Sequence, residues 1–226
     1  MSSSLHVLVR QAHNIRTNDA DSRRKKLAYS SQISRNNPTA YLFLIDESGS
    51  MGEKMPSGIT KAEFVADVIN RTIMNMIVRC TKAEGVRDYF EVGVIRYSGD
   101  EIANALQGPL ATRLFNPISA LENNLLRLES RVQKLDDGAG GVFERNIRFP
   151  VWYEPKASGV TPMRSAFILA AEALSEWCDA HPKSYPPTLL HLTDGESSDG
   201  DPEEIAELLK KIGTEDGEVL LFNLHA

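Results

Sequence analysis

Cysteines are scarce in this sequence of 226 residues, and the two that occur, Cys80 and Cys178, are far apart. Two cysteines without C-x-x-C spacing cannot form a disulfide framework, so a reducing compartment is the simpler expectation. Long apolar runs are also missing, because no stretch approaches the roughly 20 residues that span a bilayer. The short apolar stretch at residues 5–9 has no basic residue before it, unlike a secretory signal peptide. We therefore expect a cytoplasmic protein without a membrane partner.

Aromatic residues make up only 7% of the chain, so its core should be mostly aliphatic. The hydrophobic share of 42% and the charged share of 25% are those of an ordinary globular protein. This composition excludes collagenous, low-complexity and wholly disordered classes of protein.

The net charge of −6 is unevenly distributed along the chain. Residues 1–38 carry seven basic and two acidic residues, a charge of +5, and residues 39–226 carry 18 basic and 29 acidic residues, a charge of −11. We interpret residues 1–38 as a flexible, solvated basic leader, because they are polar and poor in aromatic residues. Binding of this leader to nucleic acid or to an acidic partner is the less favoured alternative. Residues 39–226 form the predicted folded domain.

Residues 41–45 are a continuous apolar run, which is too short for a helix and predicts a strand buried on both faces of a parallel sheet. The predicted strands are residues 41–45, 90–97, 188–193 and 219–224. Helices are predicted between them. One follows a capping box formed by Thr60 and Glu63, one begins with Thr161 as its N-cap and Pro162 as its first residue, and one ends at Gly213. The pattern indicates an α/β protein with a Rossmann-like, doubly wound, mostly parallel sheet flanked by helices.

Two parts of the pattern are irregular. Residues 98–158 are interrupted by Pro109, Pro117 and the glycine-rich residues 138–141, and we expect a hairpin plus an irregular insertion there. The chain also ends two residues after its last predicted strand, without a helix to cover that strand. We therefore expect a C-terminally truncated version of the fold.

Five oxygen-bearing side chains are predicted to converge at one edge of the sheet. Asp46 and Asp194 each follow a predicted strand, and ligands of open α/β sheets bind beyond the carboxyl ends of the strands. Ser48 and Ser50 come just after the first aspartate, and Thr161 lies on the same side if the crossover connections are right-handed. Hard cations such as Mg²⁺ prefer oxygen ligands, and the absence of His and Cys argues against zinc or copper. The sequence therefore predicts one Mg²⁺ or Mn²⁺ site.

Such a site suggests a function. If hydroxyl groups bind the ion directly and the carboxylates act through water, the ion keeps an affinity for one more anionic oxygen. An Asp or Glu carboxylate of a protein partner can supply it. We therefore expect a non-enzymatic, metal-dependent module for protein–protein interaction.

Three motifs together resemble the von Willebrand factor A (vWA) domain and its metal-ion-dependent adhesion site (MIDAS). The motifs are Asp-Glu-Ser-Gly-Ser at residues 46–50, Gly-Val-Thr-Pro at 159–162 and Thr-Asp-Gly-Glu at 193–196. The resemblance covers residues 39–226. It implies that Ser48, Ser50 and Thr161 contact the ion, while Asp46 and Asp194 hold its water ligands.

The resemblance is to the intracellular bacterial type of this family, whose members look like adaptors working beside AAA+ ATPases or kinase–phosphatase pairs. It therefore implies a protein partner of one of these kinds. The chain departs from the family pattern in the length of residues 98–158 and in lacking the family's last helix and strand.

Two alternative roles are compatible with the same residues. Each motif alone is an ordinary turn or helix cap, so the domain could be purely structural with a degenerate site. A Mg²⁺-dependent aspartyl phosphatase would use Asp46 as nucleophile, but it needs a second acid where Ser48 stands. No P-loop, nucleophile elbow or HExxH motif occurs, and we expect no enzyme activity. We expect Asp199 to be a solvated loop acid and His191 a core histidine.

Overall fold

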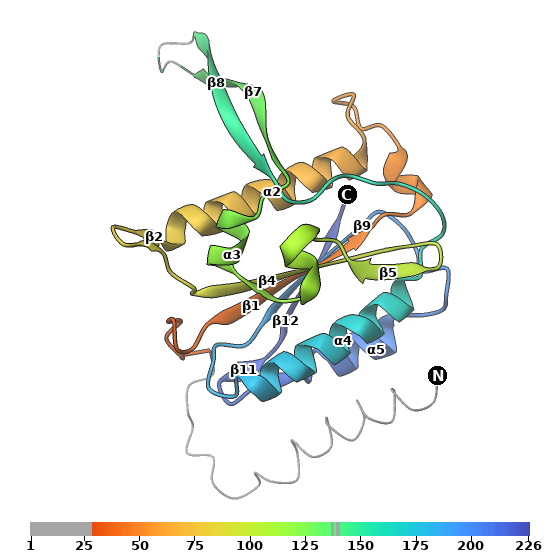
Figure 1. The fold of residues 1–226 in the computed structure, drawn as a ribbon. Coiled ribbons are helices and arrows are strands. Elements are labelled where there is room, and N and C mark those ends of the chain that lie inside the picture. Colours follow the sequence, from red (N-terminus) through yellow and green to blue (C-terminus); the bar gives the residue numbers. More distant parts are fainter. Residues whose placement is uncertain (1–28, 137, 139–140) are drawn as a thin grey trace, which may run out of the picture.

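The structure is a computed structural model that describes residues 29–136, 138 and 141–226. A six-stranded sheet forms its centre (Figure 1). The strand order is β12-β9-β1-β4-β5, and the short strand β6 also pairs with β4. The bounds of these strands are β1 (Thr39–Asp46), β4 (Phe90–Ser98), β5 (Glu101–Asn104), β6 (Asn116–Pro117), β9 (Thr188–Thr193) and β12 (Leu220–His225).

The middle of the sheet is parallel, as the apolar run of residues 41–45 predicts. β1 pairs in parallel with β4 on one side and with β9 on the other, and β12 pairs in parallel with β9. Only β5 and β6 run antiparallel to their neighbour β4. β12 lies at one edge of the described sheet, where Phe222 and Leu224 are exposed.

Helices cover both faces of the sheet, which confirms the predicted doubly wound α/β class. α2 (Lys61–Cys80) and α3 (Ile118–Asn123) lie on one face, and α4 (Met163–Ala180) and α5 (Glu203–Leu209) lie on the other (Figure 1). Along β1, Phe43 and Ile45 pack into the core beneath α2, whereas Leu42 and Leu44 pack into the core beneath α4. Successive side chains of a strand point to opposite faces, so a strand buried on both faces must be apolar throughout.

The start of α2 agrees with its predicted capping box. The backbone N–H of Glu63 donates to the Thr60 hydroxyl at 3.1 Å, and the Thr60 N–H donates to the Glu63 carboxylate at 2.7 Å. These two bonds satisfy N–H groups that a helix start leaves without partners.

The predicted start of α4 is wrong by one residue. Pro162 is the N-cap of this helix, with φ −77° and ψ 58°, so Thr161 lies outside it. The Asp199 carboxylate instead accepts hydrogen bonds from the N–H groups of Arg164 and Ser165, both at 2.9 Å. Asp199 therefore caps α4 from a distant loop, and it is exposed, as expected for a solvated loop acid.

The end of α5 differs from the prediction as well. The helix ends at Leu209, and Gly213 belongs to a small hairpin formed by β10 (Gly213–Thr214) and β11 (Gly217–Glu218). The other short elements are η1 (Gly49–Gly52), β2 (Thr81–Lys82), β3 (Gly85–Val86) and η2 (Gly108–Thr112).

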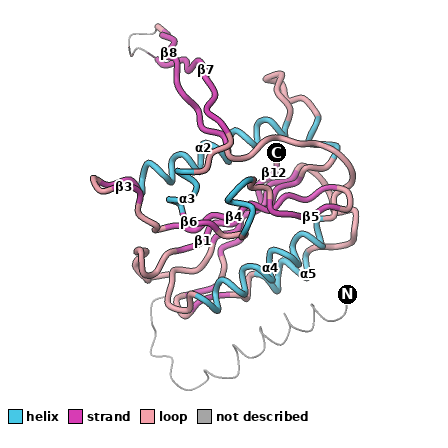
Figure 2. The backbone as a smooth tube through the Cα atoms, viewed as in Figure 1, coloured by secondary structure: helices cyan, strands magenta, loops and turns pink. Residues whose placement is uncertain are grey.

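Residues 98–158 contain more regular structure than the sequence suggests, including β5, β6 and α3. Two long strands, β7 (Arg127–Asp136) and β8 (Val142–Val151), form a hairpin that projects from the body beyond α2 (Figures 1 and 2). The hairpin is attached to α2, because Arg131 of β7 donates to Asp67 at 2.7 Å and Arg71 of α2 lies 5.8 Å from the ring centre of Phe149 in β8. Residues 137, 139 and 140 at its tip lie outside the described residues.

Most of the predicted leader lies outside the described residues, which begin at Tyr29. The first described residues contact the body, because Asp216 accepts hydrogen bonds from the N–H groups of Ser30 and Ser31 at 3.1 and 2.9 Å. The folded part therefore begins before Pro38. In the described part of the chain, no helix combines the length and apolar character needed to cross a membrane.

Candidate metal centre

The two aspartates of the predicted site lie side by side at one rim of the sheet. β1 and β9 are parallel neighbours in which Ile45 pairs with Leu192, so both strands end at this rim. Asp46 is the last residue of β1 and is 1% exposed, and Asp194 directly follows β9 with a side chain that is 0% exposed. The parallel pairing of β1 and β9 thus brings two buried carboxylates together at this rim.

Asp46 is held by two hydrogen bonds. One carboxylate oxygen accepts from the backbone N–H of Ser48 at 2.8 Å, and the other accepts from the hydroxyl of Thr193 at 2.7 Å. Both partners come from the strand ends themselves, so the orientation of Asp46 is fixed by the fold. The sequence did not single out Thr193, although its position next to Asp194 offered a signal.

The serines connect one aspartate to the other. The hydroxyl oxygens of Ser48 and Ser50 are 3.2 Å apart, and the Ser50 hydroxyl donates to Asp194 Oδ1 at 2.7 Å. Four of the five predicted residues therefore form one hydrogen-bonded chain, which runs from Asp46 through both serines to Asp194.

Thr161 is placed next to this chain by its backbone segment. Gly49 N–H donates to the Gly159 carbonyl at 2.9 Å, and Ser198 N–H donates to the Thr161 carbonyl at 2.8 Å. Thr161, which is 9% exposed, therefore lies between the loop that follows β1 and the loop that follows β9. Gly159 has φ 72°, and a Cβ there would lie 3.0 Å from backbone atoms of Gly99, so this close approach requires glycine.

Lys61 is a member of the site that the sequence did not predict. Its ammonium group donates to Asp194 Oδ2 at 2.8 Å and to a carboxylate oxygen of Glu53 at 2.8 Å. The hydrogen bond to Asp194, followed by that to Glu53, raises the pKa of Lys61 above its ordinary value.

A second buried acid, Glu47, supports the loop from behind. Its carboxylate accepts a hydrogen bond from the Tyr153 hydroxyl at 2.8 Å and lies 3.4 Å from the Arg96 guanidinium. Burial raises the pKa of Glu47, and the bonds from Tyr153 and Arg96 partly offset that effect. Glu47 thus anchors the loop to β4 and to the segment that follows β8.

The chemistry of the donor atoms fits a hard divalent cation. The set contains two carboxylates and three hydroxyl groups, and the described residues include no cluster of three or more His, Cys, Asp and Glu side chains with metal-binding geometry. Hydroxyl and carboxylate oxygens suit Mg²⁺ and Mn²⁺, whereas zinc and copper sites use His or Cys. The hydrogen bonds among these side chains hold them in place, and the ammonium of Lys61 opposes a cation.

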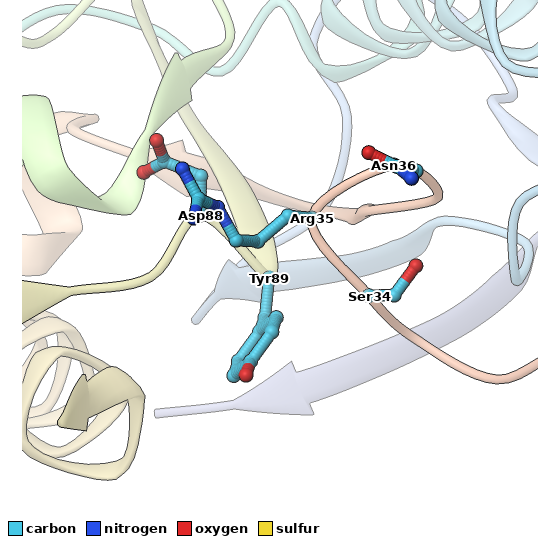
Figure 3. Close-up of a pocket in the computed structure, with 5 residues that line it drawn as sticks. All are labelled: Ser34, Arg35, Asn36, Asp88 and Tyr89. Atoms are coloured by element: carbon cyan, nitrogen blue, oxygen red, sulfur yellow. The ribbon is translucent and has the colours of Figure 1, made fainter.

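A polar depression of about 530 Å³ lies elsewhere, lined by Ser34, Arg35, Asn36, Asp88 and Tyr89 (Figure 3). It is next to the start of β4, at the end of the sheet opposite the carboxylates. Arg35 reaches toward Asp88 in this depression, and Asp88 also accepts a hydrogen bond from the N–H of Ser119 at the start of α3, at 3.0 Å. The depression is therefore separate from the candidate metal centre.

The sequence matches no family model and no curated protein. Solved structures similar to the chain include one titled von Willebrand factor type A from Catenulispora acidiphila, with 12% identity and a TM-score of 0.37, covering 83% of this chain and 33% of that one.

Two other similar structures are bacterial pilus proteins. The type V pili tip protein Mfa5 from Porphyromonas gingivalis has 14% identity and a TM-score of 0.38, covering 71% of this chain and 20% of that one. The pilus adhesin RrgA from Streptococcus pneumoniae has 13% identity and a TM-score of 0.37, covering 74% and 22%. The chain thus spans between a fifth and a third of the length of these proteins, and similarities this weak assign neither a family nor a function.

Proposed function

We propose that this chain is a cytoplasmic bacterial vWA-type domain that binds a protein partner through a MIDAS-type Mg²⁺ or Mn²⁺ site and has no enzyme activity. The observation that supports this most is the hydrogen-bonded chain from Asp46 through Ser48 and Ser50 to Asp194. It joins two neighbouring strand ends into one cluster of oxygen atoms, against which the Thr161 segment packs.

Each residue of the cluster has a distinct role in this proposal. Ser48, Ser50 and Thr161 supply neutral hydroxyl ligands, and Asp46 and Asp194 hold water molecules in place. The two hydrogen bonds on Asp46 support this division, because they fix its carboxylate in one orientation. The ion, when bound, supplies an open coordination position to which a carboxylate can bind.

The exposure of the rim supports a macromolecular partner. Gly49, Ser50, Gly195 and Glu196 are exposed, and the Val160 side chain is 58% exposed. A protein that presents an Asp or Glu side chain can therefore reach the site without entering a cavity. An AAA+ ATPase or a kinase–phosphatase system is the class of partner that the family resemblance suggests.

Metal-dependent thermal stability tests the metal site. A ligand that binds only the native state at ten times its dissociation constant adds about 1.4 kcal/mol to stability, so Mg²⁺ or Mn²⁺ should raise the melting temperature by roughly 3–6 °C. The variants Asp46→Ala and Thr161→Ala should lose this rise, whereas Thr72→Ala, which removes a hydroxyl from α2, should keep it. If Thr161→Ala responds to metal like the parent protein, the site is assigned wrongly.

Affinity capture tests the partner. A protein retained from the native cell extract in Mg²⁺ should elute with EDTA, and the Thr161→Ala variant should not retain it. Turnover of phosphate esters that disappears in Asp46→Ala would instead favour the aspartyl phosphatase alternative.

A further inference from the structure

The positive charge of Lys61 interacts unfavourably with the dipole of its own helix. It is the first residue of α2, where the helix dipole favours acidic side chains and disfavours basic ones. Helix stability therefore does not explain why a lysine stands at this position. Its contacts explain it, because the ammonium group bridges Asp194 and Glu53 at 2.8 Å each.

The contact with Asp194 neutralises a carboxylate that water does not reach. The Asp194 side chain is 0% exposed, and a buried charge without a partner is strongly unfavourable. The Ser50 hydroxyl binds one oxygen of Asp194 and the Lys61 ammonium binds the other. In this arrangement Lys61 provides the positive charge that Asp194 needs.

A divalent cation at the proposed site would also provide that charge. An ammonium group and a divalent ion that share one carboxylate lie within a few ångströms of each other and repel strongly. Both cannot remain close to Asp194 in the positions that each prefers, so they compete for it.

The second partner of Lys61 gives the ammonium group an alternative position. Glu53 is 66% exposed, and the Lys61 backbone N–H donates to the Glu53 carbonyl at 3.0 Å, which keeps the two residues adjacent. The lysine stem is flexible. The ammonium group can therefore leave Asp194 and still pair with Glu53.

We propose that Lys61 is an internal counter-ion that competes with the divalent cation for Asp194 and thereby sets the metal affinity of the site. This inference rests on the proposed metal-binding function. Without metal, Lys61 keeps Asp194 neutralised and the rim intact. With metal, Lys61 pairs with Glu53 alone, and moving it weakens metal binding.

The test measures Mn²⁺ dissociation constants by electron paramagnetic resonance of free Mn²⁺. Lys61→Met should bind Mn²⁺ at least about tenfold more tightly than the parent protein. Lys61→Gln keeps a hydrogen-bond donor without the charge, and it should also bind Mn²⁺ more tightly than the parent. It serves as the test if Lys61→Met does not fold. Glu53→Gln should bind more weakly, because Lys61 then has only Asp194 as a partner. The matched control is Lys54→Met, which changes an exposed lysine next to Glu53. Its Mn²⁺ dissociation constant should stay within twofold of that of the parent.

Each result decides between the two proposals. The role of Lys61 is overturned if both Lys61 variants bind Mn²⁺ as tightly as the parent protein or more weakly. The metal site itself remains supported in that case, provided that the parent binds Mn²⁺ and Thr161→Ala does not. Binding by the Lys61 variants alone supports the inference, since Lys61 then blocks the parent site. No binding by the parent or by either Lys61 variant overturns both proposals.

Discussion

Individual hydrogen bonds organise the rim before any ligand arrives. Asp46 is fixed by Ser48 and Thr193, and Asp194 by Ser50 and Lys61. The loss of a group that orients a metal ligand in this way typically lowers metal affinity about 10- to 100-fold. The site is therefore held together by protein contacts, and in the proposed function its response to metal depends on how easily Lys61 moves.

The buried His191 in β9 is a second polar residue with defined partners. Its Nε2 lies 2.7 Å from the Tyr97 hydroxyl and its Nδ1 lies 3.0 Å from the Asn223 side-chain oxygen. The side chain is 0% exposed, and burial lowers its pKa to about 4, although the bond to Asn223 raises it slightly. The prediction of a core histidine with satisfied hydrogen bonds is confirmed.

This histidine should make stability depend on pH. The unfolded chain binds a proton at His191 near pH 6.5 and the native protein only near pH 4, so stability is lost as pH falls through this window. Between pH 7 and pH 4.5 we expect a loss on the order of 2 kcal/mol from this residue. Urea unfolding at the two pH values should show the loss in the parent protein and in the control His181→Gln, but much less of it in His191→Gln. Equal losses in all three proteins would contradict the assignment.

Among the secondary structure elements, those with strong local signals were predictable. β1 contains a continuous apolar run, β4 and β9 are rich in buried apolar residues, and α2 has both a capping box and an apolar face. β6, β10 and β11 have two residues each, too few for any periodicity, and their formation depends on tertiary contacts. The Gly99-Asp100 turn between β4 and β5 is a local hairpin signal that the irregular pattern of residues 98–158 obscures.

The position of the α4 cap shows the limit of local reasoning. Thr161 and Pro162 form a good start signal, but the helix uses an acid 35 positions later in the chain for the N–H of Arg164. A residue so distant cannot be identified as a cap without the fold. The consequence is functional, because Thr161 stays outside the helix and beside the proposed metal site.

A buried amide of α2 helps to attach the long insertion to the body. Asn70, which is 2% exposed, accepts hydrogen bonds from the N–H groups of Trp152 and Tyr153 at 2.8 and 3.0 Å and donates to the Tyr153 carbonyl at 2.8 Å. The same side chain therefore satisfies three backbone groups that water does not reach.

Replacing this amide should be costly. Asn70→Ala leaves these buried backbone groups without partners, so we expect a loss of about 2–4 kcal/mol in the free energy of unfolding. The matched control Asn75→Ala changes an exposed asparagine of the same helix and should change stability by less than about 0.5 kcal/mol. Denaturant unfolding measures both values, and similar losses in the two variants would show that Asn70 does not hold the insertion.

For the whole molecule, the site depends on three segments that are distant in sequence and meet at one rim. The five residues of the proposed site could be predicted from the sequence because parallel strands end at the same edge and connections are right-handed. Lys61 could not be predicted in this way, since the contact with Asp194 depends on where α2 begins relative to β9. The charge of −11 on residues 39–226 also favours cations over acidic partners at long range. In the proposed function, the contact with the ion must therefore supply the attraction for a carboxylate.

Anomalous diffraction from crystals soaked in Mn²⁺ tests the central claim most directly, because it locates the ion. We predict one strong peak among the hydroxyl oxygens of Ser48, Ser50 and Thr161, with Asp46 and Asp194 next to it and the Lys61 ammonium group turned toward Glu53. The peak should be absent from crystals of Thr161→Ala soaked in the same way. No peak at this rim at saturating Mn²⁺, or a peak that persists unchanged in Thr161→Ala, would contradict the account.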